Sequence, residues 1–184
     1  MASTMRYVSG DCRPTAVKCD PSYPIEVGDL LFLEPSNNLA RPAGALVNQG
    51  SEALNQGALH DTFLGVALQK NGLQTGETVP LNSTVNHSPA NVVEAATAGR
   101  FLFACAATAW NPGALVGGAN NAGGTALQNQ AVKSVANTSL AIGRAVPAAD
   151  EIGVSLTQVI VQIESTVFGG GAQTPVAGSS SGAV

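Results

Sequence analysis

Short apolar runs separated by polar turn residues fill most of the chain. The clearest alternation lies in residues 157–163, where Val159, Val161 and Ile163 face one way. The other side carries Gln158, Gln162, Glu164 and Ile160. A period of two residues predicts a half-buried strand here. The apolar run at residues 30–33, which follows a Gly-Asp pair and is stopped by a proline, predicts a second strand.

Further short apolar runs occur at residues 63–68, 92–96, 100–105, 132–135 and 140–146. Turn signals separate them, at Asn71-Gly72, at Asn111-Pro112-Gly113 and in the glycine-rich stretch 117–121. No window combines a sustained helical period with capping residues, so we expect little helix. Many short strands at regular spacing predict an all-β fold, built as a small β-barrel or sandwich.

The two halves of the chain echo each other weakly. Residues 28–31 precede residues 63–68, and residues 113–116 precede residues 141–146 in a similar way. Each half has a turn glycine, an apolar strand, a polar excursion and an apolar strand centred on Gly-x-Ala. A glycine inside a strand marks a bulge or a close backbone approach. A duplication that closes one barrel with approximate two-fold symmetry and a chance match both explain so short an echo.

The ends of the chain differ from its middle. Residues 1–24 contain Pro14, Pro21 and Pro24 between short apolar stretches, which predicts an extended N-terminal arm with one short strand at Arg6-Tyr7-Val8. Residues 169–184 are rich in Gly and Ser, which is typical of a flexible tail. The β-barrel domain is therefore expected at residues 25–168.

Charge is sparse on this chain. Charged residues make up 11% of the sequence, against about 25% in typical soluble domains. The hydrophobic fraction is 45%, but much of it is alanine, which buries little area per residue. A weak core and a neutral polar surface favour stabilisation by a partner or by self-assembly. A stable neutral β protein is the alternative.

Several classes of function are disfavoured by charge and hydropathy. The net charge of −4 and the three scattered lysines argue against a nucleic-acid partner. The longest apolar run, residues 101–109, is too short to span a bilayer, so no membrane partner is expected. The N-terminal residues lack the apolar segment of a signal peptide, so we expect a cytoplasmic product that is not exported by the usual route.

Cysteine and histidine residues offer little chemistry. Cys12, Cys19 and Cys105 lack zinc-site spacing and are expected to be free thiols, with a Cys12–Cys19 disulfide as the alternative. His60 and His87 lie in polar stretches and are expected to be solvated loop residues. The glycine-rich stretch 117–124 lacks the Lys-Ser/Thr ending of a phosphate loop and is interpreted as a plain loop. We therefore expect no enzyme, no cofactor and no metal site.

Three further positions have ordinary structural interpretations. Asp150 and Glu151 are adjacent acids near an expected turn. Trp110 is the single tryptophan, and its position before Asn-Pro-Gly favours a turn anchor packed on the core. A carbohydrate-binding module would use exposed aromatic platforms, so the lone Trp110 argues against that class.

A series of motifs follows in fixed order along residues 25–165. They are the Gly-Asp turn at 28–29, FLGVAL at 63–68, VVEAATAGRFLF at 92–103, PGALV at 112–116, IGRAV at 142–146 and TQVIVQIES at 157–165. This order resembles the capsid decoration, or cement, proteins of tailed bacteriophages. Members of that family begin with a Gly-Asp turn, carry an IGVA-like strand and end in a V-x-V-x-I strand. The arm and the tail depart from the compact pattern of the family.

The resemblance implies a β-barrel subunit on the capsid exterior of the virion. Such subunits clamp adjacent copies of the major capsid protein after head expansion, and they are often oligomeric, here with a trimer preferred over a dimer. We expect the contacts with the shell or with other copies to involve Arg6, Tyr7, Val8 and Phe168. The strand at Arg6-Tyr7-Val8 would add to the sheet edge of a neighbour. A head-fibre or a carbohydrate- or receptor-binding β module of the virion is the alternative.

Overall fold

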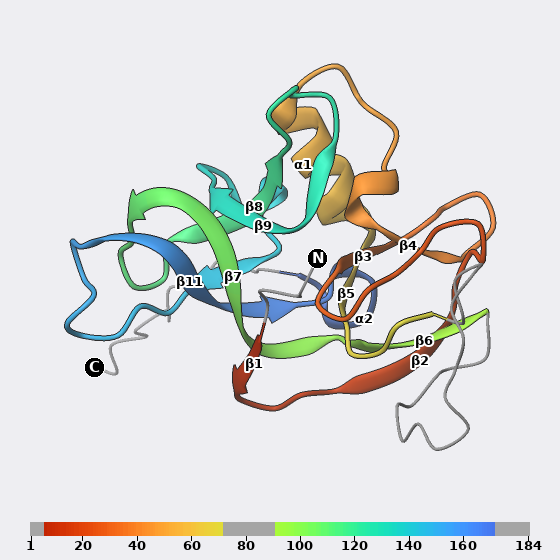
Figure 1. Ribbon diagram of the computed structural model, residues 1–184, viewed down its shortest axis with the longest axis horizontal. Helices are drawn as coiled ribbons and strands as arrows, with labels where there is room; N and C mark the ends of the chain where they lie inside the picture. The colour runs from red at the N-terminus through yellow and green to blue at the C-terminus, as the bar shows by residue number, and fades with distance from the viewer. Residues whose placement is uncertain (1–5, 72–90, 172–184) are drawn as a thin grey trace, which may run out of the picture.

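The computed structural model describes residues 6–71 and 91–171 (Figure 1). Strands make up 45% of the structure and helices 14%, which confirms the all-β prediction. Three parts of the prediction lie outside the described residues. They are His87, the Gly72 half of the expected Asn71-Gly72 turn, and most of the expected tail.

The described residues form eleven strands, two α-helices and two short 3₁₀ turns. The strands are β1 (Arg6–Ser9), β2 (Pro14–Lys18), β3 (Leu30–Leu33), β4 (Ala40–Pro42), β5 (Phe63–Ala67), β6 (Val92–Ala96), β7 (Ala98–Ala109), β8 (Leu115–Asn120), β9 (Leu127–Ser134), β10 (Gly143–Ala145) and β11 (Ser155–Glu164). The helical elements are η1 (Ala43–Ala45), α1 (Glu52–Thr62), η2 (Thr138–Leu140) and α2 (Thr166–Gly169).

The strands form two sheets, and each sheet closes on itself. One has the order β1-β7-β11-β10-β8-β9, with β9 also pairing with β7 in parallel. The other has the order β2-β6-β5-β3-β4. A parallel bridge between Cys19, just after β2, and Ala40 in β4 joins its two edges. Both sheets are therefore barrel-like, and they lie on the left and the right of Figure 1.

The two sheets repeat one five-stranded plan. In strands β2 to β6 the first strand pairs with the fifth, the fifth with the fourth, the fourth with the second and the second with the third. Strands β7 to β11 pair in the same sequence, and in both units the first strand meets the third in parallel. Strand β1 is the one addition to this plan in the described residues. We call β2–β6 unit 1 and β7–β11 unit 2.

The backbone hydrogen bonds of the two units match residue by residue. In unit 1 the N–H of Gly28 donates to the carbonyl of Ala67 at 2.8 Å, and in unit 2 the N–H of Gly113 donates to Ala145 at 2.8 Å. These four residues belong to the turn glycines and Gly-x-Ala strands of the sequence echo. The structure therefore favours a duplication over a chance match, but each half closes its own barrel-like sheet, which corrects the prediction that the two halves close one barrel.

The glycine of each Gly-x-Ala motif allows a close backbone approach. A Cβ atom on Gly65 would collide with the carbonyl oxygen of Ala96, and one on Gly143 would collide with that of Gln162. Leu31 pairs with Gly65 and Val116 pairs with Gly143, so the two glycines also occupy the same register. This confirms the prediction that these glycines mark a close approach.

The N-terminal segment is part of the sheets, which corrects the prediction of a separate arm at residues 1–24. Strand β1 pairs with β7, β2 pairs with β6, and between them Thr97 donates its N–H to Arg13 at 2.9 Å. Residues 6–18 thus run antiparallel to residues 92–102 across both units. Pro14 is compatible with β2 because β2 is an edge strand, where a missing N–H is tolerated.

Little helix is present, as expected, but the sequence did not reveal helix α1. Ser51 caps it by accepting a hydrogen bond from the N–H of Leu54 at 3.3 Å. The buried side of α1 includes Asn55 and Gln56, and the Gln56 amide donates to the carbonyl of Gly118 at 2.9 Å. Because polar residues occupy the buried side, the helix lacks the apolar period that would have revealed it.

The glycine-rich stretch expected to form a loop begins as strand β8. Gly117 and Gly118 are buried in that strand under α1 and η2. A Cβ on Gly117 would lie 2.6 Å from the carbonyl oxygen of Leu140, and one on Gly118 would lie 3.0 Å from Leu59 Cδ2. These glycines therefore serve close packing, and the loop is confined to the residues after Asn120.

The core confirms two predictions. Val159, Val161 and Ile163 of β11 are buried, whereas the alternate positions remain partly or fully exposed. Trp110 is 1% exposed and belongs to the main core cluster, as expected for a turn anchor.

Candidate binding surface

Strand β1 carries three of the four residues expected at a contact. Arg6 pairs with Leu102 and Tyr7 pairs with Phe101, and the register shifts between Tyr7 and Ser9. The Tyr7 ring meets Phe101 edge-on at 5.5 Å between centroids. Its hydroxyl donates to the carbonyl of Gly10 at 2.6 Å. These contacts hold β1 in place on the sheet.

The outer edge of β1 is open in the described part of the chain. β1 is the last strand of its sheet, and only β7 pairs with it there. Tyr7 and Val8 are 47% and 45% exposed. An edge strand offers a row of unpaired N–H and C=O groups to another strand. The expected strand does not reach out to a neighbouring sheet, because it is already bound to β7; instead it presents an edge on which a partner strand can add.

Phe168, the fourth expected contact residue, lies on α2 and not on β1. It is 58% exposed, whereas the other four phenylalanines are buried. Ser165 fixes the turn, since its hydroxyl accepts from the Phe168 N–H at 3.2 Å and donates to the Phe63 carbonyl at 3.0 Å. Because α2 packs mainly against α1 and β5, the structure does not join Phe168 to β1 in one site.

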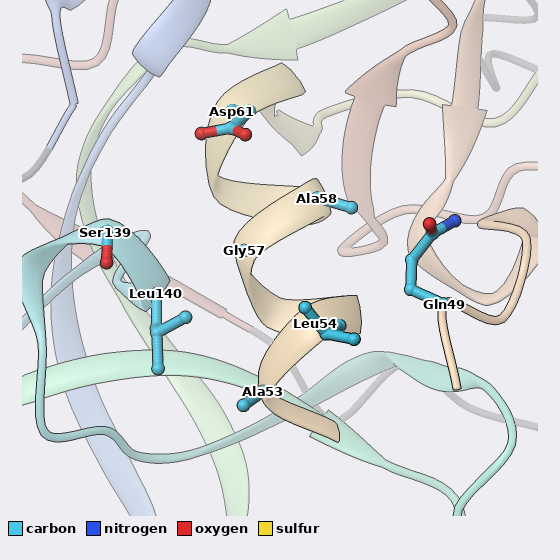
Figure 2. Close-up of a pocket in the computed structure, with 8 residues that line it drawn as sticks. All are labelled: Gln49, Ala53, Leu54, Gly57, Ala58, Asp61, Ser139 and Leu140. Carbon is cyan, nitrogen blue, oxygen red and sulfur yellow. The ribbon is translucent and has the colours of Figure 1, made fainter. Parts of the chain in front are cut away.

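A shallow groove follows the outer side of α1 (Figure 2). It is lined by Gln49, Ala53, Leu54, Gly57, Ala58, Asp61, Ser139 and Leu140. η2 packs against α1 beside Gly57, where an added Cβ would make only an ordinary contact of 3.7 Å with Leu140 Cδ2. Leu54 is 59% exposed. The groove is apolar along most of its length and has the Asp61 carboxylate at one end.

A second hollow lies where β7, β8 and β9 meet near the start of α1. Small side chains such as Ala104 and Ala131 form much of its wall. Lys133 Nζ pairs with Glu52 Oε2 at 2.9 Å at its rim, which ties α1 to β9. The charges at this rim therefore satisfy each other.

His60 is an ordered structural residue, which corrects its assignment to a solvated loop. It lies in the last turn of α1 and is only partly exposed. Its Nδ1 lies 2.6 Å from the carbonyl oxygen of Ala141, which makes Nδ1–H the donor. This bond anchors the end of α1 to the segment that leads into β10.

The described residues offer few candidates for a catalytic or metal-binding group. Across residues 6–71 and 91–171, no three His, Cys, Asp or Glu side chains are grouped so as to hold a metal ion. In the same residues no helix has the length and apolar character required to span a membrane. Asp150 lies exposed in the turn before β11, and the Glu151 carboxylate accepts from the Ala148 N–H at 2.8 Å, so both acids occupy a turn as expected.

The three cysteines are free thiols in the structure. Burial raises the pKa of Cys12, Cys19 and Cys105 above the ordinary thiol value, which lowers their reactivity. Cys19 and Cys105 occupy equivalent places, since each forms the parallel contact that closes its unit, with Ala40 and Val132 respectively. Their positions indicate a packing role.

Asp29 is a buried acid at the contact between the two units. It is 2% exposed, and its carboxylate accepts hydrogen bonds from the Glu26 N–H at 3.0 Å and the Gln130 amide at 2.9 Å. Burial raises the pKa of Asp29 above its ordinary value. The Asp of the Gly-Asp turn thus links unit 1 to unit 2 through its hydrogen bond with Gln130.

Sequence reasoning missed a second edge, on β2, which is open before the bridge between Cys19 and Ala40. Pro14, Ala16 and Lys18 alternate along this strand and are all exposed. A proline and a lysine on alternate positions are typical of an edge strand. That pattern in the sequence could have predicted an edge strand, but residues 1–24 were interpreted as an arm instead.

Comparisons with known proteins found no relative of this chain. A scan of protein-family models found no match, and searches of curated proteins and of solved structures found none either.

Proposed function

We propose that the chain is a structural virion protein that binds the outside of a phage capsid shell. In this role it stabilises the shell by clamping adjacent major capsid proteins. The observation that carries the proposal is the open outer edge of β1, with Tyr7 and Val8 exposed on it. The motif order along residues 25–165 and the low surface charge support it.

The attachment works by strand addition. An extended segment of the shell protein pairs with the outer edge of β1, and each backbone hydrogen bond contributes about 0.5–1.5 kcal/mol. The exposed side chain of Val8 adds apolar contact. Such a contact is weak alone, but a subunit that bridges two capsid proteins gains avidity because its second contact is intramolecular.

The strand is prepared for this contact before binding. Tyr7 is fixed by Phe101 and by its hydrogen bond to Gly10, so β1 does not have to order when a partner arrives. Pre-organisation removes part of the entropy cost of association. The sheet beneath β1 is closed by the β7–β9 pairing, which keeps the edge rigid.

The alternative virion roles gain less support. A sugar-binding module would present an exposed aromatic platform, but Trp110 is buried in the core. Assembly into a trimer stays a prediction from the family resemblance. So does location on the capsid exterior after synthesis in the host cytoplasm.

The test compares two valine variants for binding to purified undecorated heads. Val8→Glu places a charge on the open edge, and Val154→Glu places one at a similarly exposed valine before β11. We expect Val8→Glu to weaken binding by about tenfold, equivalent to about 1.4 kcal/mol, and Val154→Glu to bind like the wild type. Equal binding by both variants would refute attachment through β1.

A further inference from the structure

The duplication assigns each residue of β2 a counterpart in β7. Ala95 pairs with both Ala67 and Thr15, and Val161 pairs with both Ala145 and Phe101. Because Ala67 and Ala145 are equivalent, Thr15 corresponds to Phe101. It follows that Pro14 corresponds to Arg100, Ala16 to Leu102 and Lys18 to Ala104.

In unit 2 the outer edge at these positions is filled. Arg6 of β1 pairs with Leu102, and Ser9 pairs with Arg100. In unit 1 no described strand lies beside the counterparts Pro14 and Ala16. At Pro14 and Ala16 the edge of β2 is therefore the vacant counterpart of the edge that holds β1, whereas its far end meets β4 at the Cys19–Ala40 bridge.

The peptide groups of this vacant edge face outward. The Glu94 carbonyl accepts from the Leu68 N–H, so Glu94 directs its peptide groups to β5, away from β2. Its neighbours in β6 therefore bond to β2, and their partners there are Thr15 and Val17. The alternation leaves the N–H and C=O groups of Ala16 and Lys18 pointing away from β6.

We infer that the outer edge of β2 is a second strand-acceptor site, which binds an extended acidic segment of the shell protein. The identity of the partner rests on the proposed function, whereas the site rests on the equivalence with the β1–β7 contact. Ala16 supplies a donor and an acceptor, as Leu102 does for β1. The partner strand lies antiparallel to β2 and carries a carboxylate beside Lys18, which has no ion-pair partner among the described residues.

Pro14 and Lys18 make this site selective. Pro14 lacks the N–H that Arg100 offers to β1, and the edge beyond Lys18 meets β4 at the Cys19–Ala40 bridge, so a strand must draw its backbone bonds mainly from Ala16. Lys18 disfavours strands that place an apolar or basic residue beside it. These features exclude indiscriminate edge-to-edge pairing and leave an acidic extended segment as the fitting occupant.

The first experiment measures binding of four variants to undecorated heads. Ala16→Pro removes the outward N–H, and Lys18→Glu reverses the charge; Ala16→Val and Lys18→Arg are the matched controls. We expect about tenfold weaker binding for the first two and less than about twofold change for the controls. Normal binding by Ala16→Pro and Lys18→Glu would overturn the site while leaving attachment through β1 intact.

The second experiment tests the site without heads. The probe is a synthetic peptide that repeats residues 4–10 with Thr4→Glu; when its residues 6–9 adopt the register of β1, the end with the new carboxylate lies toward the Lys18 side chain. In an NMR titration we expect shifts centred on the amides of Ala16 and Lys18, and their loss in Lys18→Glu. No shift at these amides, or an equal shift in Lys18→Glu, would overturn the inference whatever the heads do.

Discussion

The side-chain amide of Gln130 donates a hydrogen bond of 2.9 Å to the carboxylate of Asp29, 101 residues earlier in the chain. Asp29 belongs to the turn that enters β3 of unit 1, and Gln130 lies on β9 of unit 2. Asn129 adds a longer bond to the same carboxylate at 3.4 Å. The two units are thus joined by a buried acid that no basic side chain neutralises in the described contacts.

Asp29 should make stability fall as pH rises. Burial raises its folded-state pKa above the unfolded value, so folding retains a proton in the window between the two values. The contribution is greatest below the ordinary Asp pKa and is lost as pH rises through the folded pKa. The free energy of unfolding of Asp29→Asn, relative to that of the wild type, should therefore increase as pH rises.

Urea unfolding at about pH 3 and about pH 8 measures this difference. Asp150→Asn, at an exposed turn acid, is the control and should shift little between the two conditions. A difference between wild type and Asp29→Asn that is independent of pH would contradict the expected titration of Asp29.

Deletion of residues 1–24 should unfold the protein and not merely detach it from a partner. The deletion removes β1 and β2, and with β2 goes the bridge at Cys19 that closes unit 1. Cys19 is buried, so its loss also opens the core. Circular dichroism and thermal unfolding check this; a cooperative transition like that of the full chain would show that the segment is dispensable.

Gly65→Ala and Gly143→Ala should be severely destabilising to a similar degree. In both, the added methyl group collides with a backbone carbonyl of the neighbouring strand, which we expect to lower the free energy of unfolding by more than about 2 kcal/mol. Gly123→Ala is the control, because its Cβ would make only ordinary contacts. Chemical denaturation of the three variants measures these free energies of unfolding. Mild effects at Gly65 and Gly143 would contradict the close backbone approach that both glycines are expected to allow.

Gln56→Leu should lower the free energy of unfolding by about 1–3 kcal/mol, because it leaves the buried carbonyl of Gly118 without a donor. The matched control is Gln162→Leu, on the exposed face of β11. Denaturant titrations compare the two. Equal stability of both variants would show that the Gln56 bond is not what seats α1.

The sequence predicted those elements whose burial follows a simple period. Strands β3, β5, β6 and β11 were visible because their apolar residues run together or alternate. Helix α1 was not predicted, because the polar residues Asn55 and Gln56 occupy its buried side and interrupt the apolar period. Only the start of β8 was predicted, in the apolar residues after Gly113; the rest was taken as a loop because its buried residues Gly117 and Gly118 are selected by contact with other elements and not by strand propensity.

The candidate site was only partly predictable for a similar reason. Tyr7 and Val8 were found from local composition, but their partner strand β7 lies about ninety residues away, and pairing at that distance has no local signature. The prolines of residues 1–24 were interpreted as a disconnected arm, although an edge strand tolerates Pro14 equally well. Phe168, the fourth predicted contact residue, is exposed, and its separation from β1 follows from the packing of α2 on α1.

The central claim is that this chain coats a phage head through the edge of β1. A cryo-electron microscopy reconstruction of undecorated heads mixed with the purified protein tests it most directly. The account predicts density for the chain on the outer surface, with a strand of the capsid protein paired to residues 6–9. Heads without added density, or a subunit attached through a face remote from β1, would contradict it.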